Sequence, residues 1–186
     1  MKIKTTLGAL ICFGLLPAFA TGADYVIDKQ GQHAFVTFKA SHLGFSYIIG
    51  HFESFEGSFS HDAKNPGNSK ASVTIETGSL DTNHAERDKH LRGADFLDVD
   101  KYPTITFESV AYSGGANAGK LTGNLSLHGV TKSVVLDVTQ IGEGKDPWGG
   151  YRSGFQGNVV LSAKDFGLPE WVGDVEVELI VEGVRL

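Results

Sequence analysis

Apolar and polar residues alternate along eight separate stretches of this chain, and this alternation limits the fold more than any other feature. In each stretch every second residue is apolar or glycine, and most of the residues between them are polar. A period of two is typical of strands with one buried and one exposed face, so the pattern predicts antiparallel β-sheet. The stretches cover residues 34–40, 55–60, 72–76, 104–108, 121–127, 134–138, 155–161 and 175–182.

The residues between these stretches are those that form turns. Asn65-Pro66-Gly67, the segment 114–117, His128-Gly129 and Asp146-Pro147 each separate two stretches. The segment 82–93 lacks the period of two and predicts one short helix instead. Asp81 or Thr82 is the expected N-cap of this helix, and Gly93 is expected at its end.

Eight strands with one apolar face bury that face most simply by closing into a barrel. We therefore predict a single all-β domain, an eight-stranded antiparallel barrel with one short helical segment. Whether its interior is solid or hollow stays open, since barrels of this size are either filled by side chains or hold one ligand. Gly57, Gly123 and Gly157 lie on the apolar face, where they either relieve crowding or leave space for a ligand.

The first residues have the features of a secretory signal peptide rather than of the fold. Lys2 and Lys4 precede the apolar run 7–19, and an A-x-A cleavage site at 18–20 is followed by another small-residue site at 21–23. We predict a signal peptide over 1–23, a folded domain over 24–186 and a periplasmic location; a buried N-terminal helix is the alternative. The run is shorter than the roughly 20 residues that span a bilayer, so no membrane-spanning segment is expected.

Removal of residues 1–23 changes the charge and the cysteine content of the chain. The remaining domain has 16 − 2 = 14 basic and 22 acidic residues, a net charge of 14 − 22 = −8, and no cysteine. An acidic domain lacks the clustered lysine and arginine that neutralise phosphates, which argues against a nucleic-acid partner. Without disulfides, its stability must come from its core.

The densest group of polar side chains lies on the predicted helix, at His84, Arg87, Asp88, His90 and Arg92. This group is either a solvated helix surface with i,i+4 pairs or a surface that faces a substrate. His84 and His90 lie six positions apart, about 240° around a helix, and no H-E-x-x-H or C-x-x-C pattern occurs. We therefore predict no metal site and no catalytic residue.

Several longer motifs, taken together, closely resemble the YceI family of bacterial periplasmic proteins. The most specific are Arg87-Asp88-Lys89-His90-Leu91-Arg92 and Leu121-Thr122-Gly123. The others are Asp24-Tyr25-Val26-Ile27-Asp28, His33-Ala34-Phe35-Val36, His42-Leu43-Gly44, Ala94-Asp95-Phe96-Leu97, Tyr102-Pro103, His128-Gly129-Val130-Thr131-Lys132 and Asp146-Pro147-Trp148-Gly149-Gly150. Ser133 departs from the family, which usually has proline there. The resemblance implies an elongated, lipocalin-like barrel that holds a polyisoprenoid or isoprenoid quinone, a periplasmic location, cleavage just before Asp24 and no established catalytic reaction.

The expected function is therefore binding and carriage of a long-chain isoprenoid lipid inside the barrel, with no other cofactor. Head-group or mouth candidates are His84, Arg87, Asp88, His90 and Arg92. The residues expected to line the tunnel are Phe38, Phe55, Phe59, Ile75, Phe107, Leu125, Leu127, Leu136, Phe155 and Leu161.

Two other functions stay open at this stage. One is an enzyme that uses His84, Asp88 and His90, with or without a metal, on a small periplasmic substrate. The other is an interaction module with a solid core. The sequence does not decide between a monomer and a homodimer.

Overall fold

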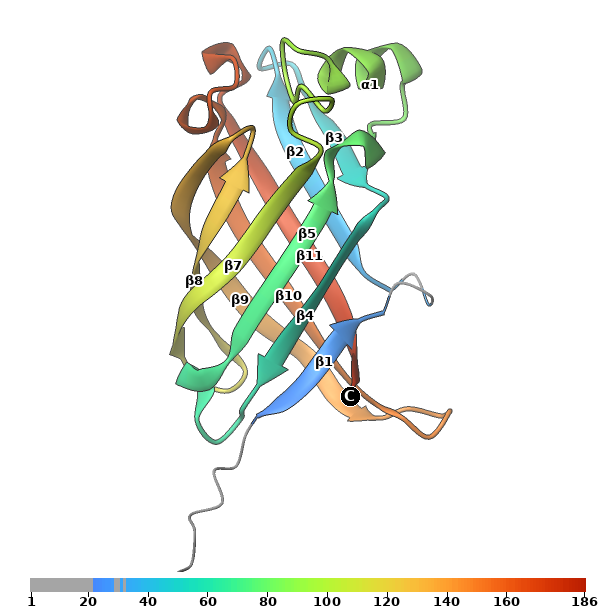
Figure 1. The fold of residues 1–186 in the computed structure, drawn as a ribbon, viewed down its shortest axis with the longest axis vertical. Helices are drawn as coiled ribbons and strands as arrows, with labels where there is room; N and C mark the ends of the chain where they lie inside the picture. The colour runs from blue at the N-terminus through green and yellow to red at the C-terminus, as the bar shows by residue number, and fades with distance from the viewer. Residues whose placement is uncertain (1–21, 29–30, 32) are drawn as a thin grey trace, which may run out of the picture.

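The alternating stretches form strands that pair, antiparallel throughout, around a closed barrel (Figure 1). The computed structural model describes residues 22–28, 31 and 33–186. The strands are β1 Ala23–Ile27, β2 Phe35–His42, β3 Ser46–Phe52, β4 Phe55–His61, β5 Lys70–Glu76, β6 Leu80–Asp81, β7 Thr104–Gly114, β8 Ala118–Leu127, β9 Val130–Lys145, β10 Tyr151–Ser162 and β11 Asp174–Arg185. Within these described residues, one α-helix, α1, spans Ala85–Arg92, and four 3-10 turns lie at Pro66–Asn68, Thr77–Ser79, Ala163–Phe166 and Glu170–Val172.

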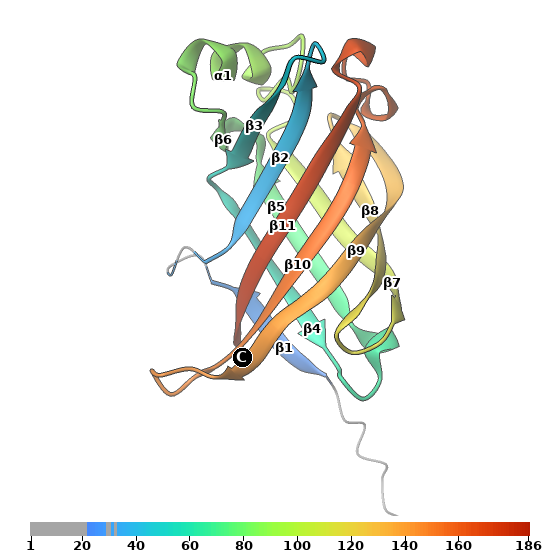
Figure 2. The same cartoon turned by 180° about the vertical axis from the view of Figure 1, so that it is seen from behind.

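The closed ring follows the order β1-β4-β5-β7-β8-β9-β10-β11, and β11 returns to pair with β1. The predicted eight-stranded antiparallel barrel with one short helix is thus confirmed. One of the eight strands in the ring was not among the predicted stretches. The stretch 34–40 forms β2, but β1 closes the ring in its place. The strand β11 pairs with β1 at its C-terminal end and with β2 over Val175–Ile180, so β2 extends the wall above β1. The strands β3 and β6 extend the wall further on the α1 side (Figure 2).

Glycines on the inner face show where the interior is crowded. A Cβ atom at Gly57 would lie 2.4 Å from the carbonyl oxygen of Ser72, and one at Gly123 would lie 2.4 Å from the Phe107 ring. At Gly157 the nearest atom is the Leu136 Cδ2, at an ordinary 3.5 Å. Crowding therefore accounts for the first two glycines, whereas a Cβ atom at Gly157 would make only an ordinary van der Waals contact.

The strands β9 and β10 separate from each other toward the α1 end of the barrel (Figure 2). Their pairing ends at Asn158 and Asp137. Beyond that point β9 stays paired with β8 as far as Val130, and β10 stays paired with β11 as far as Ser162. Each strand keeps one neighbour and loses the other, which leaves an interruption in the wall.

The helix α1 begins later than the sequence indicated. Its N-cap is His84, whose Nδ1 accepts a hydrogen bond from the Arg87 N–H at 3.2 Å, so the predicted cap at Asp81 or Thr82 is wrong. The physical reason is a turn at Asn83, which has a φ of 62° and whose N–H donates to Asp81 Oδ1. The helix ends at Arg92 as expected, and the Gly93 N–H donates to the His90 carbonyl.

Candidate functional site: an apolar cavity inside the barrel

The α1 half of the barrel contains a cavity of about 780 Å³. Side chains of β2, β3, β5, β6 and β7 to β11 form its wall, and residues of α1 and of the loops near it form the end. Among the predicted tunnel residues, seven line this cavity: Phe38, Ile75, Phe107, Leu125, Leu127, Leu136 and Leu161. The barrel is therefore hollow here, which contradicts the solid core of the interaction-module alternative.

A second, smaller cavity of about 100 Å³ lies farther from α1. Phe59 and Phe155 line it, and Phe107 and Leu136 line both cavities. Because the two cavities share wall residues, they lie end to end inside the barrel. Phe55 is the one predicted tunnel residue that lines neither; it is only 8% exposed and belongs to the packed core.

Aromatic side chains gather at the α1 end of the main cavity. The ring of Phe96, in the loop after α1, lies edge-on to Trp171 with ring centroids 5.6 Å apart. It also meets the His90 ring at 4.9 Å. Phe96 and Trp171 lie outside the alternating stretches, so periodicity gave no signal for them. Phe96 belongs to the motif Ala94-Asp95-Phe96-Leu97, whereas the only indication for Trp171 in the sequence is its size and apolarity in a loop.

Of the five polar candidates near α1, Arg87 and His90 line the main cavity, whereas His84, Asp88 and Arg92 do not. Asp88 is 6% exposed and accepts hydrogen bonds from the Thr82 N–H at 2.9 Å and hydroxyl at 2.5 Å. Arg87 donates to the Thr82 hydroxyl and carbonyl, at 2.7 and 2.6 Å. Arg92 donates to the Leu80 carbonyl. The hydrogen bonds of Arg87, Asp88 and Arg92 therefore hold α1 against β6 and the turn that follows β6.

Burial and hydrogen bonding act in opposite directions on the Asp88 carboxyl. Burial alone would raise its pKa, because it disfavours the charged form. The two hydrogen bonds from Thr82 and the positive charges of Arg92 and Arg87 outweigh that effect and lower the pKa below its ordinary value. Asp88 is thus held ionised, as an acceptor, and is poorly suited to donate a proton to a substrate.

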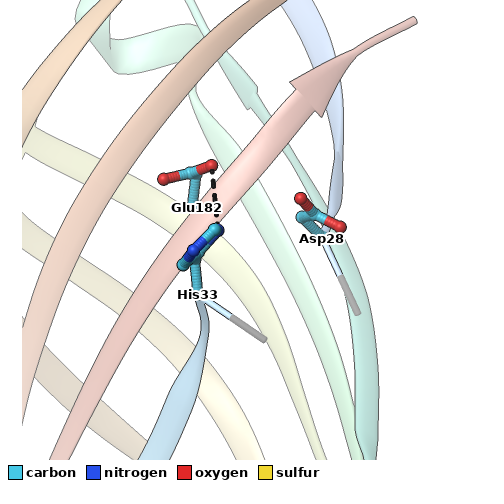
Figure 3. Close-up of side chains that lie close together, drawn as sticks. All are labelled: Asp28, His33 and Glu182. Atoms are coloured by element: carbon cyan, nitrogen blue, oxygen red, sulfur yellow. Dashed lines mark ion pairs between the residues drawn. The ribbon is translucent and has the colours of Figure 1, made fainter. Parts of the chain in front are cut away.

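The described residues contain two groups of three potential metal ligands, and neither includes the helix residues 84, 88 or 90. Asp28, His33 and Glu182 form the first group (Figure 3). There the Arg152 Nη1 already lies 2.5 Å from Asp28 and 2.6 Å from Glu182, so the carboxylates are neutralised by a guanidinium. The second group, His51, Glu53 and Asp81, lies outside both cavities and is largely exposed. The geometry gives the metal-enzyme alternative no support.

The wall of the main cavity also borders the outer surface where β9 and β10 separate. An external groove of about 690 Å³ lies over this part of the wall. Val134, Val159 and Leu161 line both the groove and the main cavity. The interruption in the wall is thus a thin region between the interior and the outside.

Among the described residues, no helix has the length and apolarity needed to span a membrane.

The fold and the cavity define the class of closed eight-stranded antiparallel barrels with an apolar space in their interior. Residues 25–184 match the model of the YceI-like domain, and the chain belongs to this YceI-like family. A UPF0312 protein of Azotobacter vinelandii is 57% identical over 190 residues, which cover 98% of this chain and 99% of that protein.

Solved structures have the same fold. A crystal structure of a Campylobacter jejuni YCEI protein aligns with a TM-score of 0.72 at 30% identity, over 78% of this chain and 90% of that one. A polyisoprenoid binding domain from Saccharophagus degradans aligns with a TM-score of 0.63 at 16% identity, over 89% of this chain and 99% of that one.

Proposed function

We propose that this protein binds and carries a long-chain isoprenoid lipid, either a polyprenyl compound or an isoprenoid quinone. The observation that carries the proposal is the apolar cavity of about 780 Å³. Each CH₂ group moved from water into such a cavity is worth about 0.8 kcal/mol, so a prenyl tail needs few directed polar contacts to be held. The fold shared with a polyisoprenoid binding domain supports this assignment.

The proposed tail contacts are the nine predicted tunnel residues that line one of the two cavities. Phe55 is no longer part of this set, because it lies outside both. From the polar group we propose Arg87 and His90 as ligand contacts, because these two residues line the cavity near α1.

The proposed location is the periplasm, reached through a signal peptide over residues 1–23. Residues 1–21 lie outside the described part of the chain, so this proposal rests on the sequence pattern alone. N-terminal sequencing of protein recovered from an osmotic-shock fraction tests it. A mature chain that begins at Asp24 is expected, and an intact Met1 in the cytoplasmic fraction would contradict it.

Mass spectrometry of an organic extract tests the ligand. Protein purified from the periplasm without detergent is expected to release a prenyl lipid in near-stoichiometric amount. An extract without any prenyl compound, from protein that also fails to bind an added prenyl quinone, would overturn the proposed function.

Two adjacent positions on β10 provide a matched pair of variants. Val159 faces the cavity, whereas its neighbour Val160 points outward and is 62% exposed. Val159→Asp would place a carboxylate in the apolar wall, and we expect binding of a prenyl quinone to fall at least tenfold, because the charge must stay hydrated. Val160→Asp should leave binding unchanged. Circular dichroism of both variants checks that the barrel has formed.

A further inference from the structure

His61 lies at the end of the barrel away from α1 and faces inward. It is the last residue of β4 and continues the inward series that contains Phe55 and Phe59. Its side chain lines the small cavity and is 8% exposed, and its ring meets Phe155 edge-on with centroids 5.2 Å apart. Its Nε2 is fully buried and has no hydrogen-bond partner within the described residues.

A buried polar atom without a partner is rare, because removing it from water costs free energy that only a new hydrogen bond offsets. The other polar groups around the small cavity are engaged elsewhere or lie on outward faces. Ser58 and Ser60 belong to the outward series of β4, and the Ser69 hydroxyl accepts a hydrogen bond from the Asp62 N–H. The Tyr112 hydroxyl donates to the Gly115 carbonyl, and the Gln156 amide donates to Glu178. Lys70 is exposed on the outward series of β5. The His61 Nε2 is therefore the group best placed to meet a polar atom inside the cavity.

The space beside His61 fits a small polar group at the end of a long apolar one. At about 100 Å³, the small cavity has room for several waters or for one ring, since one water needs roughly 10–15 Å³ of such volume. Val73, Phe107, Leu136 and Leu179 line both cavities. A ligand whose tail fills the main cavity is thus placed to reach His61 with its other end.

The polar side chains at the α1 end are less suitable hydrogen-bond partners for a ligand. Arg87 already donates from Nε and Nη2 to Thr82, and His90 packs against the ring of Phe96. Arg92 also has a buried nitrogen without a partner, its Nε, but Arg92 lines neither cavity. Within the described residues, the buried side-chain atom that lacks a hydrogen-bond partner and belongs to a residue lining a cavity is the His61 Nε2.

We infer that the small cavity is a polar subsite in which the His61 Nε2 forms a hydrogen bond with one uncharged oxygen of the bound lipid. This inference rests on the proposed function. It adds that the lipid carries an uncharged oxygen, and it adds the orientation of the lipid in the barrel. An imidazole nitrogen donates to a carbonyl oxygen or accepts from a hydroxyl, depending on its tautomer. The lining of the small cavity is mostly apolar, and an ionised group would lose its hydration there, so an uncharged oxygen fits the subsite better. The oxygenated end of the lipid then lies away from α1.

Two probes with the same amount of prenyl chain test this inference. One is a benzoquinone that carries six prenyl units, and the other is squalene, a hydrocarbon of six such units. The purified, delipidated protein is expected to bind both. His61→Phe keeps an aromatic ring but removes the nitrogen, so it should weaken quinone binding about tenfold and leave squalene binding unchanged. His61→Gln, which restores a polar side chain, should recover part of the loss.

His51→Phe is the matched control, because His51 is an exposed histidine outside both cavities. Thermal unfolding of each variant checks that the fold is retained. Unchanged quinone affinity in a folded His61→Phe variant would overturn the inference and would mean that water alone satisfies His61. A loss of quinone affinity in His90→Gln but not in His61→Phe would place the oxygen at the α1 end instead. Failure of the wild-type protein to bind either probe would instead contradict the proposed function.

Discussion

Gly123 and Gly157 face the interior from neighbouring parts of the wall, yet a methyl group meets different surroundings at each. Gly123→Ala would place a Cβ 2.4 Å from the Phe107 ring and 2.7 Å from the Glu108 carbonyl oxygen, and a backbone atom of a paired strand cannot shift without strain. We expect a loss of about 1–3 kcal/mol in the free energy of unfolding. Gly157→Ala meets only Leu136, at 3.5 Å, and should change stability by less than about 1 kcal/mol. Urea unfolding followed by circular dichroism measures both, and equal losses would contradict the argument.

Asp88 makes the stability of the helix attachment depend on pH. Its lowered pKa means that the ionised form is favoured in the folded state. This contribution is complete above the unfolded-state pKa of about 3.9 and is lost as the pH falls through the lower folded-state pKa. Asp88→Asn replaces charge-assisted hydrogen bonds from Thr82 with neutral ones and should cost about 1–2 kcal/mol at pH 7.

The measurement for Asp88 is a series of urea unfolding curves between pH 7 and pH 2.5. The difference between wild type and Asp88→Asn should shrink as the pH falls below about 4. Asp95→Asn removes an exposed carboxylate nearby and serves as the control, with a small effect expected at every pH. A difference for Asp88→Asn that stays constant down to pH 2.5 would show that its charge is not involved.

Alternation predicted which face each residue joins, but not the level it reaches along the barrel. Phe55 and Leu125 both face inward, yet only Leu125 lines a cavity. Likewise, the burial of His61 depends on β1, since Ala23 pairs with His61 in the closed ring. A period of two carries no information on such pairings, which is why the sequence predicted the wall of the site better than its two ends.

At the scale of elements, the long regular strands were predictable and the short ones were not. The strand β10 spans Tyr151–Ser162, and its alternation is clear in the sequence. By contrast, β6 has two residues, and β3 contains the adjacent apolar pair Ile48 and Ile49, so neither shows a period of two. The position of the α1 N-cap depends on the turn at Asn83, which no hydrophobic pattern records.

The separation of β9 from β10 predicts uneven protection of backbone amides. Over 130–136 of β9 and 159–162 of β10, the amide groups that point toward the missing neighbour have no ladder partner. We expect these amides to exchange with deuterium at least tenfold faster than the amides of 137–140 and 155–158, where the two strands are paired. Hydrogen exchange read by NMR resolves single amides. Uniform protection along both strands would show that they close on each other in solution.

At the scale of the whole molecule, the hollow interior links stability to ligand. The apolar residues around the main cavity are packed on one side only, so the empty barrel lacks contacts that a packed core of the same size would have. A ligand that binds the folded state alone adds RT ln(1 + [L]/Kd) to the free energy of unfolding, about 2.7 kcal/mol when its concentration is 100 times Kd. For a domain of this length, the corresponding change in Tm is roughly 5–10 °C.

Removal of the bound lipid should therefore lower the Tm by this amount without changing the far-ultraviolet circular dichroism spectrum. The barrel is expected to stay folded, because its strand ladder closes around the ring independently of the interior. Re-addition of a prenyl quinone should restore the original Tm, whereas a short alcohol that leaves most of the cavity empty should not. If extraction left the Tm unchanged although a lipid had been released, the lipid would be bound outside the barrel, because filling the cavity must stabilise the state that contains it.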